Sequence, residues 1–145
     1  FASRCDMPAE IADYCRETGQ IVPEGPAQIL RLVTDSLALK VRFVLDRLEK
    51  LIDRPIDILH IIGGGGQNDQ LNMSISSSIN RPVIVGPYEA TAAGNLMMQE
   101  VASGRLDSLE EGRALIRNSF ATKRFEPQHP KEWEEAYQRF AKLIS

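Results

Sequence analysis

A chain of 145 residues with 17 basic and 20 acidic side chains has the length of one ordinary domain and a formal charge of −3. Charges of both signs are interspersed, so the chain has neither a basic stripe for nucleic acid nor a polybasic anchor for a membrane. It also contains no apolar run of the roughly 18 residues that a transmembrane helix needs, and no signal-peptide pattern. We therefore expect a cytoplasmic domain without nucleic-acid or membrane partners.

Cysteine and histidine are too few to build a metal site or a hydrolytic site. Cys5 and Cys15 cannot form a disulfide framework, and together with His60 and His129 they give no zinc-ligand spacing. Neither histidine has a serine or cysteine partner at a readable spacing, so the pattern does not support a hydrolase. We expect reduced thiols and no metal bound by the chain's own residues.

The first half of the chain predicts two helices. Asp6 suits an N-cap, Pro8 falls in the first turn, and Gly19 ends this helix. After a proline-rich connection, Ala27 to about Asp53 form one long helix, because the apolar residues recur at intervals of three and four. We expect a core helix packed on a sheet rather than a coiled coil or a partner surface. The apolar stripe consists of Leu30, Val33, Leu37, Val41, Val44, Leu48 and Leu51.

A short apolar run at 58–62 then leads into four consecutive glycines, Gly63 to Gly66. A buried strand that opens into glycines lets backbone approach a ligand where no Cβ would fit, and the ligand we expect is a nucleotide. The run is not a dinucleotide fingerprint, because Asn68 stands where the third glycine is needed, and no Gly-Lys-Ser/Thr ending makes a P-loop. Asn68 suits the N-cap of the next helix, where its side chain accepts from helix amides or turns toward a bound base. Spacing alone supports a nucleotide site and a purely structural turn equally.

The glycines are followed by the rest of a βαβ unit. A helix over 68–79 carries an apolar stripe and ends at Asn80, which suits a left-handed C-terminal position. A second strand follows at 82–85. Strand, helix and strand of this length should form a parallel, right-handed unit.

The last third of the chain predicts three more helices. The first begins near Glu89, ends before Gly104, and has small early residues that should let it lie unusually close to its neighbours. The second opens at Ser108 with a capping pattern, and 120–130 is expected to be irregular. The third spans 131–144 and should dock on the domain through an aromatic stripe. That stripe consists of Trp133, Tyr137, Phe140 and Leu143.

Six stretches of the chain carry a family resemblance. Four of them follow from the glycine run onward, and two precede it, at 15–20 and 36–40. The four are Ile-Ile-Gly-Gly-Gly-Gly-Gln-Asn at 61–68, Leu71-Asn72, Arg81-Pro82-Val83, and Gly-Pro-Tyr-Glu-Ala-Thr-Ala-Ala-Gly-Asn at 86–95. Together they resemble the C-terminal domain of the FGGY carbohydrate kinases, and the likeness covers nearly the whole chain.

The resemblance implies an α/β fold, namely the C-terminal lobe of an actin-like (RNase H-type) ATPase with ATP held between two lobes. Gly64 matches the ATP-contacting glycine, Gly63 and Gly65 flank it, and Asn68 matches the asparagine beside the adenine. The family transfers the γ-phosphoryl group of ATP to a sugar hydroxyl, with Mg²⁺ bridging ATP oxygens. The members that this chain most resembles convert a ketose, L-rhamnulose, to L-rhamnulose 1-phosphate. The implied cofactors are therefore ATP and Mg²⁺.

Length sets the role that we expect for residues 1–145. A two-lobed sugar kinase needs about twice the usual domain length or more, so the chain should be a fragment that supplies the ATP-side lobe. The sugar-binding lobe and the catalytic aspartate are then expected upstream, and no catalytic residue is expected here. Two alternatives stay open, because a fold carries no function by itself. They are a non-catalytic ATP- or sugar-binding relative, and a small interaction domain in which the glycines are only a turn.

Overall fold

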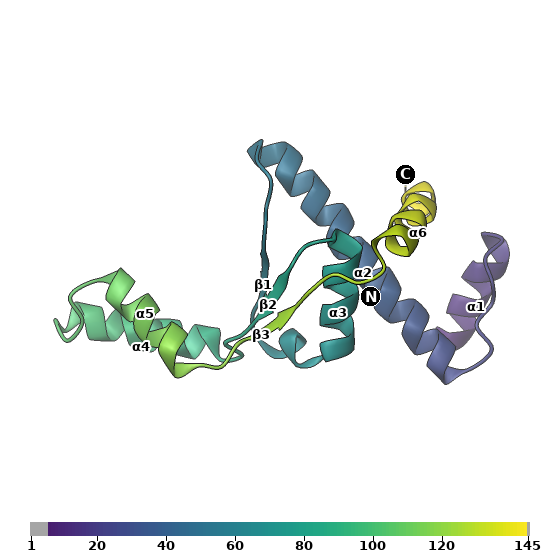
Figure 1. Ribbon diagram of the computed structural model, residues 1–145. Coiled ribbons are helices and arrows are strands. Elements are labelled where there is room, and N and C mark those ends of the chain that lie inside the picture. The colour runs from purple at the N-terminus through teal and green to yellow at the C-terminus, as the bar shows by residue number, and fades with distance from the viewer. Residues whose placement is uncertain (1–5, 145) are drawn as a thin grey trace.

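The computed structural model describes residues 6–144, which form one three-stranded sheet and the helices around it (Figure 1). The chain begins with two helices and ends with one, and the strands and the remaining helices lie between them. In chain order the elements are α1 (Met7–Glu17), α2 (Pro26–Ile52), β1 (Leu59–Ile61), the 3₁₀ turn η1 (Gly64–Gln67), α3 (Asp69–Ile79), β2 (Val83–Val85), α4 (Ala90–Ala102), α5 (Leu109–Ser119), β3 (Lys123–Phe125) and α6 (Pro130–Leu143).

The sheet has the order β1-β2-β3, with β1 parallel to β2 and β3 antiparallel to it. The parallel strand–helix–strand unit predicted from the sequence is therefore confirmed. The register pairs His60 with Ile84 and Ile84 with Arg124, so these three side chains lie on one face of the sheet. The other face carries Val83 and its partners, which pack into the core beneath α3. The face with His60 has no helix packed on it among residues 6–144 and is more open to solvent.

Two sequence expectations about the strands were wrong. Segment 120–130 was expected to be irregular, yet Lys123–Phe125 forms β3. Its strand signal is weak because Lys123 and Arg124 face solvent on an edge and only Phe125 is buried. The strand after the long helix was expected to be buried, but β1 is an edge strand whose His60 is exposed.

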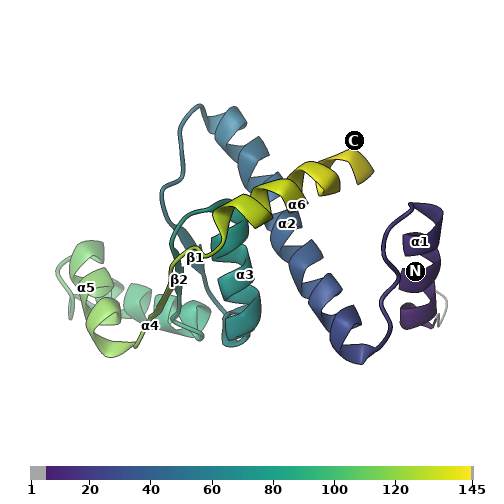
Figure 2. The ribbon, with the colours of Figure 1, turned by 45° about the vertical axis from the view of Figure 1, so that its right-hand side comes forward.

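The core lies between the sheet, α3 and α2. Its buried members come from four elements, α2, α3, β2 and β3, and α3 lies between the strands and α2 (Figures 1 and 2). The buried members are Ala38, Leu45, Ile75, Ile79, Val83, Val85 and Phe125. The C-terminal turn of α3 ends as predicted at Asn80, which adopts the left-handed conformation with φ 50°.

The long helix is present as predicted, but the expected packing of its apolar stripe was wrong. α2 rests on α3 rather than on the sheet, and it does so through Ala38 and Leu45. The stripe itself faces solvent: Leu37 is 51% exposed, Leu48 44% and Leu51 81%. Periodicity identifies a helix and its apolar side, but it does not say which residues cover that side. Val41 is the member of the stripe that packs against the core, and the exposed members are not covered within residues 6–144.

The C-terminal helix docks on the domain as its aromatic stripe predicts. α6 packs on α2 and α3, and Trp133 and Tyr137 are half-buried there. The guanidinium of Arg42 lies 3.9 Å from the centre of the Tyr137 ring and also donates to the Glu134 carboxylate at 2.5 Å. α6 is thereby fixed to the same helices that hold the core.

Helices α4 and α5 form a hairpin that projects from one end of the sheet (Figure 1). Close packing of the small residues of α4 was expected and is not observed, since the helix has no buried residue. A Cβ at Gly94 would meet nothing within 4 Å. Within residues 6–144, no helix combines the length and apolar character needed to cross a bilayer.

Candidate functional site

The glycine run forms a tight turn between β1 and α3. Gly63 has φ 79°, a conformation that favours glycine, and residues Gly64–Gln67 form a single 3₁₀ turn. The Gly66 amide donates to the Gly63 carbonyl at 3.1 Å, and the Asn68 amide donates to the Gly65 carbonyl at 3.4 Å. The four residues expected to contact nucleotide, Gly63, Gly64, Gly65 and Asn68, therefore lie together at the carboxyl end of β1.

Asn68 is the N-cap of α3, as the sequence predicts. Its Oδ1 accepts from the Leu71 amide at 3.0 Å, and the residue is exposed. This bond satisfies one of the orphan amides of the helix and fixes the direction in which α3 leaves the turn. The side-chain nitrogen keeps its donor capacity for a ligand.

The glycines differ sharply in the space around them. A Cβ at Gly64 or Gly65 would meet nothing within 4 Å, and both residues are exposed. A Cβ at Gly66 would instead lie 2.6 Å from Val85 Cγ1 and 3.2 Å from Tyr88 Cε1. Gly66 is thus needed for packing against β2, whereas Gly64 and Gly65 present bare backbone to open space. Such a surface fits a flat ligand that approaches the main chain closely.

A second segment reaches the same end of the sheet after β2. The Gly86 amide donates to the Ile61 carbonyl at 2.9 Å, which ties the segment to β1 just before the glycine turn. Gly86 has φ 111°, and a Cβ there would lie 3.2 Å from the Ala121 carbonyl oxygen. The Gly86–Pro87 peptide bond is cis. The segments at 61–68 and 86–95 both carry the family resemblance, and the structure brings them together.

An ion pair that the sequence did not predict also lies beside the turn. Lys123 Nζ donates to both carboxylate oxygens of Asp69, at 2.9 and 2.8 Å. The hydrogen bond to Asp69 is the main reason that the pKa of Lys123 is raised above its usual range. Asp69 is the first residue of α3, and Lys123 is paired with Val85 across the sheet. No sequence signal placed Lys123 here, because β3 was not predicted.

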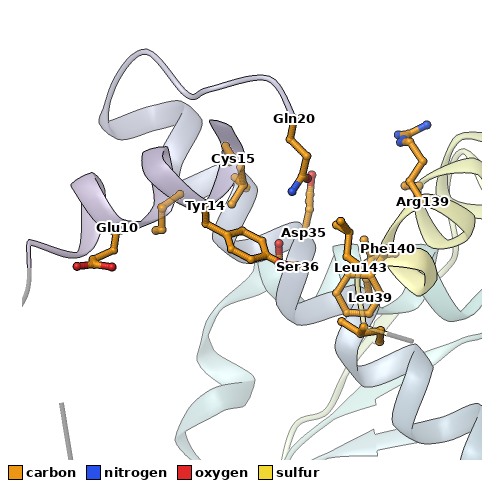
Figure 3. Close-up of a pocket in the computed structure, with 14 residues that line it drawn as sticks. Glu10, Tyr14, Cys15, Gln20, Asp35, Ser36, Leu39, Arg139, Phe140 and Leu143 are labelled. Atoms are coloured by element: carbon orange, nitrogen blue, oxygen red, sulfur yellow. The ribbon is translucent and has the colours of Figure 1, made fainter. Parts of the chain in front are cut away.

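A cavity lies elsewhere, between α1, α2 and α6 (Figure 3). It has a volume of about 570 Å³ and is lined by Tyr14, Cys15, Leu39 and Phe140, among others. Cys15 is a free, buried thiol, whereas Cys5 lies outside the described residues. None of the glycines lines this cavity.

A metal site is not formed by this part of the chain. In residues 6–144, no group of three or more His, Cys, Asp or Glu side chains is arranged to hold an ion.

Fold and site together define an α/β domain whose sheet carries an open glycine turn at its carboxyl end, an arrangement that suits ligand binding. The model of the FGGY family of carbohydrate kinases, C-terminal domain, matches residues 1–103, and the chain belongs to this family. The site residues 63–68 lie within the match.

Curated relatives narrow the likeness to one kind of kinase. The chain is 44% identical to the rhamnulokinase of Bacteroides thetaiotaomicron over 99% of its own length and 30% of that protein. It is 37% identical to the rhamnulokinase of Lactiplantibacillus plantarum, over 97% of the chain and 29% of that protein. With the Bacillus subtilis rhamnulokinase the identity is 38%, over 88% and 26%. The chain thus spans less than a third of the length of these relatives.

Solved structures confirm the predicted fold. The Plasmodium falciparum glycerol kinase structure with ADP aligns with a TM-score of 0.68 at 22% identity, over 81% of this chain and 23% of that one. A Brucella ovis xylulose kinase aligns at 0.67 and 22%, over 86% and 26%. These neighbours have the actin-like ATPase fold.

Proposed function

We propose that this chain is the ATP-side lobe of a kinase that transfers the γ-phosphoryl group of ATP to L-rhamnulose and forms L-rhamnulose 1-phosphate. The observation that carries the proposal is the 44% identity to a rhamnulokinase over 99% of the chain. The open backbone at Gly64 and Gly65 supports the nucleotide part, since it leaves room for a ligand against the turn. The sugar itself is inferred from the relatives alone.

In this proposal the chain positions ATP and does no covalent chemistry. Adenosine lies on the bare backbone of Gly64 and Gly65, and the conformation of Gly63 sets the turn. The side-chain Nδ2 of Asn68 is available to donate to the base. Phosphoryl transfer depends mainly on positioning and charge neutralisation, so a rigid adenosine site contributes directly to the rate. The base that accepts the sugar proton belongs to the upstream lobe. In this proposal Mg²⁺ would enter the site bound to the phosphates of ATP.

We propose that the upstream lobe of the same protein is the main partner. Three apolar or unpaired surfaces support this: the α2 stripe, the outer edge of β1, and the open face of the sheet. Ile58 is 38% exposed and Ile62 is 60% exposed on that face. Exposed apolar residues grouped on one helix face and an unpaired strand edge are typical of surfaces that meet another domain. Acting together with this partner, the enzyme would work in the cytoplasm, where ATP is supplied.

The test compares the full-length protein with residues 1–145 alone. Each is mixed with ATP, Mg²⁺ and L-rhamnulose, and ADP release is followed. We expect turnover only when the upstream lobe is present, either in one chain or co-expressed, because one lobe cannot position both substrates. Turnover by residues 1–145 alone would contradict the two-lobe proposal.

The same assay separates the two alternatives. Full-length protein that binds ATP but releases no ADP with any ketose would be a non-catalytic relative. Full-length protein that is folded and shows no rise in Tm with ATP would leave the glycines as a structural turn.

A further inference from the structure

Helix α3 is unusual because its buried side is largely polar. The buried polar residues of residues 6–144 all lie on it, and each hydroxyl among them has a hydrogen-bond partner on a neighbouring element. Ser78 Oγ, for example, donates to the Ala38 carbonyl of α2 at 2.8 Å. The buried polar set is Asn72, Ser74, Ser76, Ser77 and Ser78.

Asn72 is the member of this set that reaches the glycine turn. Its side chain is fully buried, and Nδ2 donates to the Gly66 carbonyl at 2.8 Å. A carbonyl oxygen can only accept, so the side-chain amide has to present its nitrogen there, which settles its orientation. Gly66 is also the glycine packed against Val85 and Tyr88. Asn72 and this packing therefore hold one end of the turn, while Gly64 and Gly65 stay open.

The other end of the same amide has no partner. Among residues 6–144, Asn72 Oδ1 is the buried side-chain oxygen or nitrogen without a hydrogen bond. Leaving a buried acceptor unpaired costs about 1–3 kcal/mol, which a purely apolar side chain at this position would avoid. Buried polar groups kept at such a cost are found where a backbone segment has to be held in one functional conformation.

We propose that Asn72 is a positioning residue that holds the glycine turn in the conformation that receives adenosine. This inference rests on the proposed function and deepens it. Asn72 does not touch the nucleotide; it acts through the Gly66 carbonyl. Loss of its donor lets residues Gly64–Gln67 move, so ATP binding then includes the cost of ordering the turn.

Ser78 offers a matched control on the same helix. Both side chains are fully buried and both donate to a backbone carbonyl at 2.8 Å, but the bond of Ser78 points to α2, away from the turn. In the full-length protein, Asn72→Ala and Ser78→Ala should lower Tm by similar amounts, since each removes one buried hydrogen bond to a backbone carbonyl. Only Asn72→Ala should raise the KM and Kd for ATP, by about fivefold, the factor equivalent to one hydrogen bond of ordinary net strength. The KM for sugar should stay within about twofold.

A second variant adds a readout that a structural role does not move. In Asn72→Asp, an ionised carboxylate of the same shape cannot donate to the Gly66 carbonyl, whereas a protonated carboxyl can. Burial raises the pKa of such a carboxyl, so its Kd for a fluorescent ATP analogue should fall toward the wild-type value as the pH is lowered through that pKa. The wild-type Kd should change little over the same range. A Kd for Asn72→Asp that follows the wild-type pH profile would overturn the proposal.

Hydrogen exchange tests the positioning role without any ligand. The Gly66 and Asn68 amides should exchange faster in Asn72→Ala than in Ser78→Ala when both are compared at equal distance below their Tm. Equal exchange in the two variants, or an equal effect of both on ATP affinity, overturns the role of Asn72. Full-length wild-type protein that fails to bind ATP would instead overturn the proposed function, and the exchange result would still decide whether Asn72 holds the turn.

Discussion

Substitution of two glycines in the same turn separates a ligand-binding role from a packing role. Gly64 and Gly66 both lie in the 3₁₀ turn, and neither has a positive φ, so backbone strain does not distinguish them. They differ in surroundings: a Cβ at Gly64 meets open space, whereas one at Gly66 overlaps Val85 Cγ1 at 2.6 Å. Gly64→Val therefore changes only the space available to a ligand.

Substitutions at the two glycines should differ in their effect on stability. Gly66→Val forces Val85 and β2 to shift, and overpacking of this kind costs about 1–3 kcal/mol. Gly64→Ala should be neutral or stabilising by up to about 1 kcal/mol, because it lowers the entropy of the unfolded chain. If adenosine lies against the turn, Gly64→Val should raise the KM for ATP by at least about tenfold, equivalent to about 1.4 kcal/mol.

The assay is steady-state ADP release by the full-length protein, with Tm measured on the same samples. Gly64→Val should raise the KM for ATP far more than the KM for sugar and leave Tm unchanged. Gly66→Val should lower Tm first. A KM for ATP that Gly64→Val does not change, or equal increases in both KM values, would refute the placement of adenosine on this turn.

Three further predictions concern stability. The Tyr137 hydroxyl donates to Asp46 at 2.6 Å, and burial, together with this bond, raises the pKa of Tyr137 to about 12. The stability that Tyr137 contributes is therefore fully present below the ordinary tyrosine pKa and is lost as the pH rises through about 12. Tyr137→Phe should cost about 1 kcal/mol by denaturant unfolding at neutral pH, and no loss would contradict the bond. The hydrogen bond from Arg81 lowers the pKa of Glu49, so the pair stabilises the fold above the ordinary glutamate pKa and this contribution is lost as the pH falls through the lowered value. Glu49→Gln should therefore flatten the acid limb of Tm against pH, and a parallel shift at all pH values would count against this cause. Leu48→Glu should hardly change the unfolding free energy of residues 1–145 alone but should destabilise the full-length protein by about 2 kcal/mol. Equal effects in both proteins would mean that the upstream lobe does not cover the α2 stripe.

Local signals in the sequence were enough to predict the βαβ unit and its turn. Asn68 caps α3 because a short acceptor before a helix satisfies its orphan amides, and Asn80 ends the helix because it tolerates the left-handed conformation. The 3₁₀ turn follows from glycines at the end of a strand. These features depend on a few neighbouring residues, which is why a sequence pattern can identify them.

Features that depend on distant residues were not predicted. β3 is defined by pairing with β2, and its Lys123–Asp69 ion pair joins residues far apart in the chain. The hydrogen bond from Asn72 to Gly66 joins residues six apart in the chain, but nothing in the pattern distinguishes a buried asparagine from an exposed one. The α2 stripe shows the same limit, since periodicity gave the helix and not what covers it.

A crystal structure of the full-length protein with ADP bound would test the central claim most directly. We expect the adenosine in van der Waals contact with Gly64 and Gly65, with Asn68 beside the base and no shift of Gly66 relative to β2. Adenosine bound instead in the cavity between α1, α2 and α6, or anywhere away from the glycine turn, would contradict the assignment of this chain's site.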